Sequence, residues 1–219
     1  MLLARGPRTG RAATDGLLPR RLAYPAVKRT LDIVLCTLAL PLLVPLFALI
    51  ALAIKIDTPG PVLFTQMRTG RDGDRFAMRK FRTMVADAEE LKASLRHLSI
   101  VPWPDFKVID DPRITRVGRI LRRTSLDELP QIVNVLRGEM TLVGPRPTSF
   151  EVSAYELWHT RRLEVPPGIT GLWQVKGRNT TTFDERLRLD IQYIAQMSLP
   201  LDLWILVGTV RAVLQRSGV

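Results

Sequence analysis

The chain has few of the residues that build metal centres and disulfides. Its 219 residues include one cysteine, Cys36, and two histidines, His97 and His159. One cysteine cannot form an internal disulfide, which fits a reducing compartment, and so few sulfur and imidazole ligands argue against a zinc site. The sequence also lacks a Walker A motif and a G-x-G-x-x-G motif after a strand, so nothing in it supports a P-loop or Rossmann nucleotide site.

Acidic residues are scarce too, above all near the N-terminus. The chain holds 32 Lys and Arg residues against 21 Asp and Glu residues, a net charge of +11, so we expect an anionic partner. Residues 1–29 contain seven basic residues and one acid, and they show no hydrophobic period. We therefore interpret residues 1–25 as a disordered basic tail near anionic lipid, where each basic residue contributes about 1 kcal/mol.

Charged residues are absent from residues 33–54, an apolar run of 22 residues. A helix of about 20 apolar residues crosses a bilayer, but Pro41 and Pro45 near the middle of this run predict a kink or a break. Basic residues flank the run on both sides, so a spanning helix would carry one basic flank across the membrane, against the positive-inside bias. We therefore expect residues 26–57 to form a re-entrant helix with both flanks in the cytoplasm, and a spanning helix with a proline kink is the alternative. The flanking basic residues are Lys28, Arg29 and Lys55.

Residues 58–198 are expected to form a cytoplasmic catalytic domain that is mainly α-helical with a small β-hairpin, an α+β arrangement. Alternating apolar residues around a Gly-rich turn predict the hairpin, and amphipathic periods predict two helices. The predicted strands are 62–66 and 75–82, the turn is 70–74, and the predicted helices are 85–98 and 183–197.

The C-terminal residues 199–219 are strongly apolar. Asp202 and Arg211 leave too few uncharged residues between them to span a membrane. Trp204 suits the interface between lipid and water, so we expect an interfacial helix here.

A basic stripe runs through residues 113–123. Arginine recurs at every third position, with apolar residues beside it and no acid between them. Such a run is most often a solvated helix face, but the neighbouring membrane segment favours a basic amphipathic helix at the membrane interface. The arginines are Arg113, Arg116, Arg119 and Arg122, and the apolar residues are Ile114, Val117, Ile120 and Leu121.

Two adjacent acids, Asp127 and Glu128, follow this stripe. Ser125-x-x-Glu128 fits a capping box, in which the acids only stabilise a helix N-terminus. Pro130 argues against that interpretation, because proline prefers the first helical position, and a helix that begins nearer Leu129 would place both carboxylates at its start. One carboxylate would then attack phosphorus while the other holds Mg²⁺, as phosphoryl transfer through an aspartyl-phosphate requires.

Further basic residues in the hairpin and in Gly- and Pro-rich loops are candidate contacts for a diphosphate. Taken singly, each would most often be a surface charge. The candidates are Lys80, Arg82, Arg146 and Arg178.

Three segments carry a resemblance to a known family. They are KFRTM (80–84), DPRITRVGRILRRTSLDELPQIVNVLRGEMTLVGPRP (111–147) and PGITGLWQVKGRN (167–179). The chain resembles the bacterial sugar transferase family, the monotopic polyprenyl-phosphate phosphoglycosyl transferases, over about residues 25–210. The family's re-entrant helix is broken at a Ser-Pro pair, where this chain has Leu40-Pro41.

The resemblance implies an enzyme that moves a sugar-1-phosphate from a UDP-sugar to undecaprenyl phosphate and releases UMP. It implies that Asp127 is the nucleophile that carries the phosphosugar, that Glu128 is the Mg²⁺ ligand, and that Arg122 binds phosphate. Lys80, Arg82, Arg146 and Arg178 match motifs of the family whose roles are less fixed.

The resemblance also implies the setting and the pathway. We expect the cytoplasmic face of a bacterial inner membrane, membrane lipid as a partner, no nucleic acid, and the first membrane step of exopolysaccharide, O-antigen or capsule assembly. A homodimer is compatible with the sequence. The alternative from another class is a membrane-tethered basic protein that binds anionic lipid or nucleic acid, which the high pI and the arginines also fit.

Overall fold

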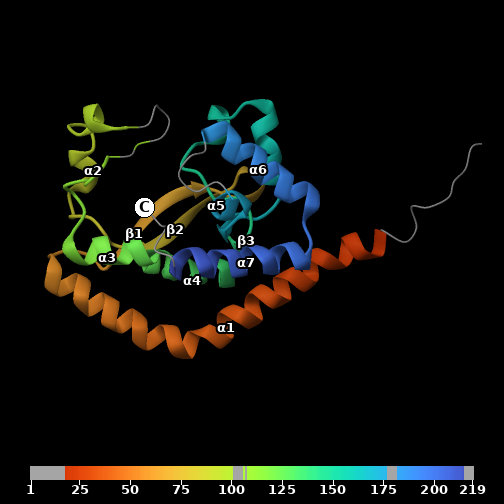
Figure 1. The fold of residues 1–219 in the computed structure, drawn as a ribbon, viewed down its shortest axis with the longest axis horizontal. Coiled ribbons are helices and arrows are strands. Elements are labelled where there is room, and N and C mark those ends of the chain that lie inside the picture. The colour runs from red at the N-terminus through yellow and green to blue at the C-terminus, as the bar shows by residue number, and fades with distance from the viewer. Residues whose placement is uncertain (1–17, 101–105, 107, 177–181, 215–219) are drawn as a thin grey trace, which may run out of the picture.

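The computed structural model describes residues 18–100, 106, 108–176 and 182–214, and Figure 1 shows their arrangement. The fold is mostly helical with small sheets, as expected, but it has two sheets: the predicted hairpin and a parallel pair of strands, Thr141–Val143 and Gly168–Thr170, that was not predicted. The helices are α1 Leu18–Asp57, α2 Ala88–Leu91, α3 Arg116–Thr124, α4 Ile132–Arg137, α5 Leu172–Lys176, α6 Phe183–Gln196 and α7 Leu199–Leu214. The strands are β1 Leu63–Thr69, β2 Arg75–Phe81, β3 Thr141–Val143 and β4 Gly168–Thr170.

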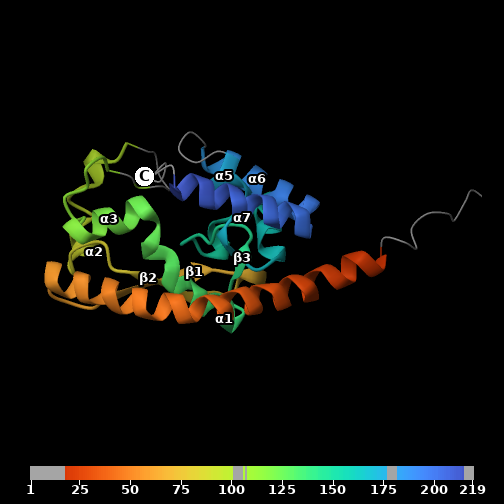
Figure 2. The ribbon, with the colours of Figure 1, turned by 60° about the horizontal axis from the view of Figure 1, so that its bottom comes forward.

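The long helix α1 lies along one edge of the molecule (Figures 1 and 2) and is bent near its middle (Figure 1). Its residues 24–57 are long and apolar enough to cross a membrane. Cys36, Ile50 and Ile54 are buried against the domain, whereas Leu38 and Leu42 are more than 70% exposed. The helix begins at Leu18, so residues 18–25, which we assigned to the basic tail, are helical, and residues 1–17 lie outside the described residues.

Polar contacts fix the N-terminal half of α1 to the domain. Arg29 donates hydrogen bonds of 2.5 and 3.0 Å to the carbonyls of Val135 and Leu136, in the last turn of α4. Asp32 accepts a hydrogen bond of 2.5 Å from the hydroxyl of Thr141 and is 5% exposed. This half of α1 is therefore held by specific partners as well as by apolar packing.

A second polar network joins α1 to the last two helices. Asp202 of α7 accepts hydrogen bonds from Tyr24, Lys28 and Tyr193 at 2.7 to 2.8 Å. Because Asp202 is 6% exposed, its charge would be unfavourable without these partners.

The predicted hairpin is confirmed, and its strands are antiparallel with Leu63 opposite Phe81. The turn uses left-handed backbone at Asp72 and Gly73, with φ values of 54° and 88°. Phe76 and Met78 of β2 pack with residues of α4 and with Cys36, and Phe81 packs with Ile50, Ile54 and Leu121. The hairpin is therefore held between α1, α3 and α4.

The basic stripe is only partly a helix. Helix α3 begins after Thr115, whose side chain accepts a hydrogen bond of 2.9 Å from the backbone N–H of Gly118. Arg113 precedes the helix and forms a buried two-pronged ion pair with Asp111, with contacts of 2.9 and 2.6 Å. The expectation that Arg113 faces membrane phosphates is therefore wrong, because a neighbouring acid holds its guanidinium in the interior.

The helix predicted over residues 85–98 is also wrong in its length. Only α2, Ala88–Leu91, is α-helical, with a 3₁₀ turn at Arg96–Leu98. The carbonyl of Ala88 accepts a hydrogen bond of 2.9 Å from Arg113, and the N–H of Lys92 bonds to Glu89 instead. A contact from a distant segment thus ends the helix.

The two C-terminal helices are confirmed. Helix α6 starts at a capping box in which Thr182 and Glu185 exchange hydrogen bonds. In helix α7, Ile205 is fully buried, and Leu203, Trp204, Val207 and Val210 are exposed.

Candidate active site

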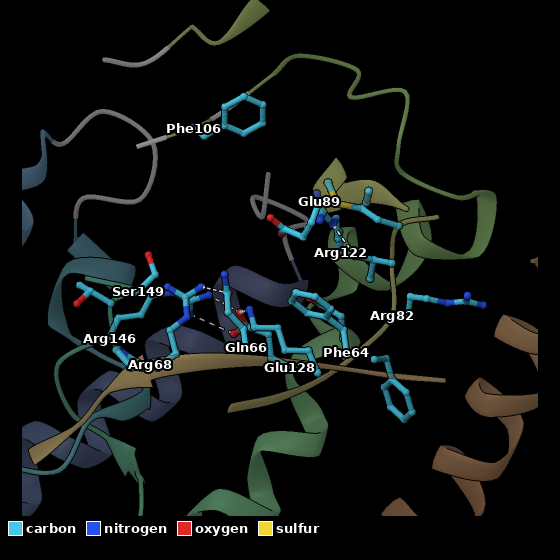
Figure 3. A pocket seen from close by; sticks show the side chains of 18 of the residues that line it. Phe64, Gln66, Arg68, Arg82, Glu89, Phe106, Arg122, Glu128, Arg146 and Ser149 are labelled. Atoms are coloured by element: carbon cyan, nitrogen blue, oxygen red, sulfur yellow. Dashed lines mark hydrogen bonds and ion pairs between the residues drawn. The ribbon is translucent and has the colours of Figure 1, made fainter. Parts of the chain in front are cut away.

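A cavity of about 740 Å³ lies between the hairpin, the 3₁₀ turn Leu126–Gln131, the loop after β3 and helix α6. Figure 3 shows side chains that line it. The charged residues of its lining include Arg68, Lys80, Arg82, Glu89, Arg113, Arg122, Asp127, Glu128, Arg146 and Arg162. Cations outnumber acids in this lining, so the cavity suits an anionic ligand.

Glu128 is the centre of the charge cluster. Lys80 Nζ lies 2.7 Å from Glu128 Oε1, and Arg146 Nη1 donates to Oε2 at 3.2 Å while its Nη2 contacts Oε1. Burial alone would raise the pKa of Glu128, but the charges of Arg146 and Lys80 overcome it and hold that pKa well below its usual range. Glu128 is therefore ionised and fixed in place at neutral pH.

Asp127 lies next to this cluster but outside its ion pairs. Burial and the charge of Glu128 raise the pKa of Asp127, while Lys80 and Arg122 oppose the shift. Within the described part of the chain, no hydrogen bond or ion pair engages its carboxylate. A partly buried carboxylate that is not held by a partner is suited to nucleophilic attack once it is ionised.

The backbone that presents these acids follows from Ser125 and Pro130. Ser125 adopts a left-handed conformation, with φ 57°, that ends α3 and turns the chain into the 3₁₀ segment. The Ser125 side chain makes no capping hydrogen bond, so the capping-box alternative is wrong. The α-helical part begins only at Ile132, later than the expected start near Leu129, because Pro130 has no N–H to donate.

Arg122 reaches the cavity from α3. Its Nε donates to the hydroxyl of Thr83 at 2.9 Å, and the charge of Asp127 acts on it. The structure thus brings together Lys80, Arg122, Asp127, Glu128 and Arg146 from three separate segments, as the sequence predicts.

Arg82 does not join this cluster. Its guanidinium donates to the carbonyl and hydroxyl of Thr58, at 2.7 and 3.1 Å, and to the carbonyl of Pro59. Figure 3 shows it pointing away from Glu128. Thr58 and Pro59, just after α1, thus hold the two terminal nitrogens of Arg82, while its Nε has no partner among the described residues, and its role as a diphosphate contact stays a prediction. Arg178, the other loop arginine, lies outside the described residues.

Two arginines of the site were not predicted. Arg162 donates to Asp190 at 2.8 Å and to the carbonyl of Arg146, so it connects the Arg146 loop to α6. Arg68 lies in β1 and lines the cavity. The two-residue period of Phe64, Gln66 and Arg68 on the strand could have revealed it, because Phe64 pairs with Lys80 and so shares its face.

The cavity offers few side chains that could bind a divalent cation. Among the described residues, no group of three or more His, Cys, Asp and Glu side chains could form a metal site alone. Mg²⁺ is commonly held by one or two carboxylates together with substrate phosphates, and the adjacent Asp127 and Glu128 fit that pattern.

A long apolar helix packs on a domain with a cationic cavity, an arrangement that suits association with a membrane and an anionic ligand. The chain belongs to the bacterial sugar transferase family, whose sequence profile matches residues 23–216. The resemblance seen in the sequence is thus confirmed over almost all of the described chain.

The chain is similar to several curated proteins. It is 39% identical to the exopolysaccharide production protein ExoY of Rhizobium meliloti over 196 residues, 87% of each chain. It is 48% identical to the galactosyl transferase CpsE of Streptococcus agalactiae over 161 residues, 73% of this chain and 36% of that protein. It is 44% identical to the undecaprenyl-phosphate galactose phosphotransferase of Salmonella typhimurium over 197 residues, 88% of this chain and 41% of that protein. The chain thus spans less than half the length of several of the relatives that it matches.

Proposed function

We propose that this protein transfers a sugar-1-phosphate from a UDP-sugar to undecaprenyl phosphate through a phosphosugar intermediate on Asp127, with release of UMP. One observation carries the proposal: a carboxylate that is not held by any described partner lies beside a second carboxylate that two cations hold ionised. Relatives of this family are named undecaprenyl-phosphate galactose and glucose phosphotransferases, which supports the substrate class.

Each residue of the cluster has a role in this chemistry. Asp127 Oδ attacks the sugar-bearing phosphorus, the bond to the UMP oxygen breaks, and the electron pair leaves with UMP. Lys80 and Arg146 neutralise the charge that the phosphate oxygens gain, and Arg122 contributes from the Asp127 side. The phosphate of undecaprenyl phosphate then displaces Asp127. One phosphate linkage replaces another in each step, so positioning and charge neutralisation provide the catalysis.

Glu128 would hold a Mg²⁺ ion jointly with phosphate oxygens of the substrate. The ion would add charge neutralisation at the transferred phosphate. Because Lys80 and Arg146 already occupy Glu128, the proposed ligand role requires one of these contacts to lengthen when substrate binds.

We also propose that α1 enters the membrane from the cytoplasmic face of the inner membrane and returns to it. Its exposed apolar side, its internal prolines and its basic flanks support this arrangement. Helices α3 and α7 would lie at the interface, since α3 exposes Arg116, Arg119 and Ile120 and α7 exposes Trp204. The acceptor phosphate would then reach the cavity while its prenyl chain stays in lipid.

A panel of UDP-sugars with undecaprenyl phosphate and Mg²⁺ tests the function. We expect UMP release with at least one donor, and the preferred donor identifies the sugar. Absence of UMP release with every donor would contradict the proposal. It would favour the alternative of a basic binding protein for lipid or nucleic acid, whose affinity for nucleic acid falls steeply with salt.

A further inference from the structure

Arg68 is a cation of the cavity that has no acidic partner. Its Nη2 donates to Gln66 Oε1, and within the described part of the chain no ion pair involves it. Its Nε is buried without a hydrogen-bond partner among the described residues. Burial, and next the nearby charge of Arg146, lower the pKa of Arg68 to about 10. A buried donor without a partner is energetically unfavourable, and an anionic ligand in the cavity would relieve that cost.

The position of Arg68 along the cavity differs from that of the other cations. The charges of Lys80, Arg122 and Arg146 act on Asp127, whereas the charge of Arg68 is felt at Arg146 and Glu128. Figure 3 shows Arg68 and Arg146 at one side of the cavity, Arg122 at the other, and Glu128 between them. Arg68 therefore lies with Arg146 on the side of Glu128 that is opposite Arg122.

The chemistry of a diphosphate donor requires a second phosphate-binding site in the cavity, away from Asp127. If Asp127 attacks the sugar-bearing phosphorus, the leaving oxygen must lie roughly in line with the attacking oxygen, on the opposite side of that phosphorus. The second phosphate of the donor is attached to this leaving oxygen, so it extends away from Asp127 and needs a cation other than those beside Asp127.

We propose that Arg68 binds the phosphate group of the nucleotide sugar that Asp127 does not attack, the phosphate that leaves with UMP. This inference rests on the proposed function and assigns a residue to one phosphate of its substrate. When the phosphorus–oxygen bond breaks, UMP gains one negative charge, and the unpaired guanidinium of Arg68 neutralises it. Gln66 orients the guanidinium through its Nη2.

The acceptor phosphate uses the same subsite. It must attack the phosphosugar on Asp127 from the side opposite the Asp127 oxygen, which is the side from which UMP left. The loss of Arg68 should therefore slow both loading of Asp127 from the donor and discharge onto undecaprenyl phosphate.

Binding of UMP and of uridine to the full-length protein in lipid nanodiscs tests the assignment. Arg68→Gln should weaken UMP binding about tenfold or more, the usual effect of losing a charge-assisted hydrogen bond, and should leave uridine binding unchanged. Arg71→Gln is the matched control, because Arg71 lies on the same hairpin with its side chain 59% exposed. Unchanged UMP affinity in Arg68→Gln would overturn the proposal.

A structural role for Arg68 predicts a different pattern. Arg68→Met removes a partly buried cation without an acidic partner, so the thermal unfolding temperature of the variant should equal or exceed that of the wild type while UMP binding is lost. A lower unfolding temperature together with weaker uridine binding would instead assign Arg68 to the fold and overturn the proposal.

Single-turnover reactions measure loading of Asp127 from the nucleotide sugar and its discharge onto undecaprenyl phosphate as two separate rates. They also distinguish a failure of this inference from a failure of the proposed function. Slower loading of Asp127 in Arg68→Gln supports the proposal, and a defect confined to discharge onto undecaprenyl phosphate contradicts it. If the wild type binds UMP through Arg68 but releases none from any donor, the proposed function fails and the phosphate site stands. If the wild type is active and Arg68→Gln loads Asp127 at the wild-type rate, only the assignment of Arg68 fails.

Discussion

Lys80 Nζ lies 2.7 Å from Glu128 Oε1, the same oxygen that Arg146 Nη2 contacts. Two cations thus share one carboxylate oxygen, while the neighbouring carboxylate of Asp127 has no ion pair within the described chain. The two adjacent acids therefore have different environments: one is bound by cations, and the other is not. Glu128 fixes the positive groups, and Asp127 remains available for a covalent bond.

Asp127→Asn should abolish transfer, with a fall in rate of at least about a thousandfold, because an amide cannot act as the nucleophile. The wild type given only the donor should release UMP and gain the mass of a phosphosugar on Asp127. Intact-protein mass spectrometry and a UMP assay check both outcomes. Full activity of the variant would end the assignment of Asp127.

Glu128→Gln should lower the rate on the order of a hundredfold and weaken the dependence on Mg²⁺. The variant removes the anion that Lys80 and Arg146 share, and it removes the proposed metal ligand. Titration of Mg²⁺ against the rate of UMP release measures the effect, with Glu89→Gln at the rim of the cavity as the control. An unchanged Mg²⁺ response would remove the ligand role of Glu128 even if the rate falls.

Loading of Asp127 should fall as the pH is lowered, and it should do so above the usual pKa of an aspartate, about 3.9. The raised pKa of Asp127 means that its carboxylate becomes protonated, and loses its nucleophilicity, at a higher pH than an exposed aspartate does. Glu128 should not contribute in this range, because its pKa is held well below its usual value. The pH profile of single-turnover loading checks this, and a flat profile down to about pH 4 would contradict it.

Arg162→Leu should destabilise the protein by about 3–5 kcal/mol, because it leaves the carboxylate of Asp190, which is 1% exposed, without its cation. The double variant Arg162→Leu/Asp190→Leu should recover much of that loss. It should still be less active than the wild type, since Arg162 also bonds to the carbonyl of Arg146. Thermal unfolding and UMP release separate the two effects. If the single and double variants were equally stable, the loss of stability in Arg162→Leu would not come from the unpaired charge of Asp190.

Asp32→Ala should loosen α1 from the domain, because it removes the acceptor of Thr141. The effect is visible at Cys36, a single cysteine that lies one turn further along α1 and is 1% exposed. Its reaction with a maleimide in detergent should be slow in the wild type and faster in Asp32→Ala. Thr30→Ala, at an exposed position of the same helix, should react like the wild type. Equal protection in all three proteins would mean that Asp32 does not hold α1 in place.

Sequence patterns correctly predicted the secondary-structure elements that depend mainly on interactions within their own segment. The hairpin, α6 and α7 follow from alternation, caps and apolar periods, and the motif residues converge on one cavity as expected. The failures have a common cause in contacts from distant segments. The carbonyl of Ala88 accepts a hydrogen bond from Arg113, and the terminal nitrogens of Arg82 donate to Thr58 and Pro59. No periodicity in one sequence encodes such pairings.

The same limit applies to the site. Adjacent acids and nearby arginines in a motif identify the cluster, but only the three-dimensional structure shows which acid forms an ion pair with which cation. The unpaired state of Arg68 could not be read from its own segment, because it depends on Glu128 being occupied by Lys80 and Arg146.

The contacts of α1 also determine how the protein can be truncated for experiments. A chain cut after Asp57 would lose Arg29 and Asp32, and it would strand the buried Asp202 without Lys28. The face of Met78, Ile132 and Val135 that packs with Cys36 would also be exposed to water. Removing α1 would therefore yield an unstable, aggregation-prone fragment, so the proposed measurements require a protein that keeps α1.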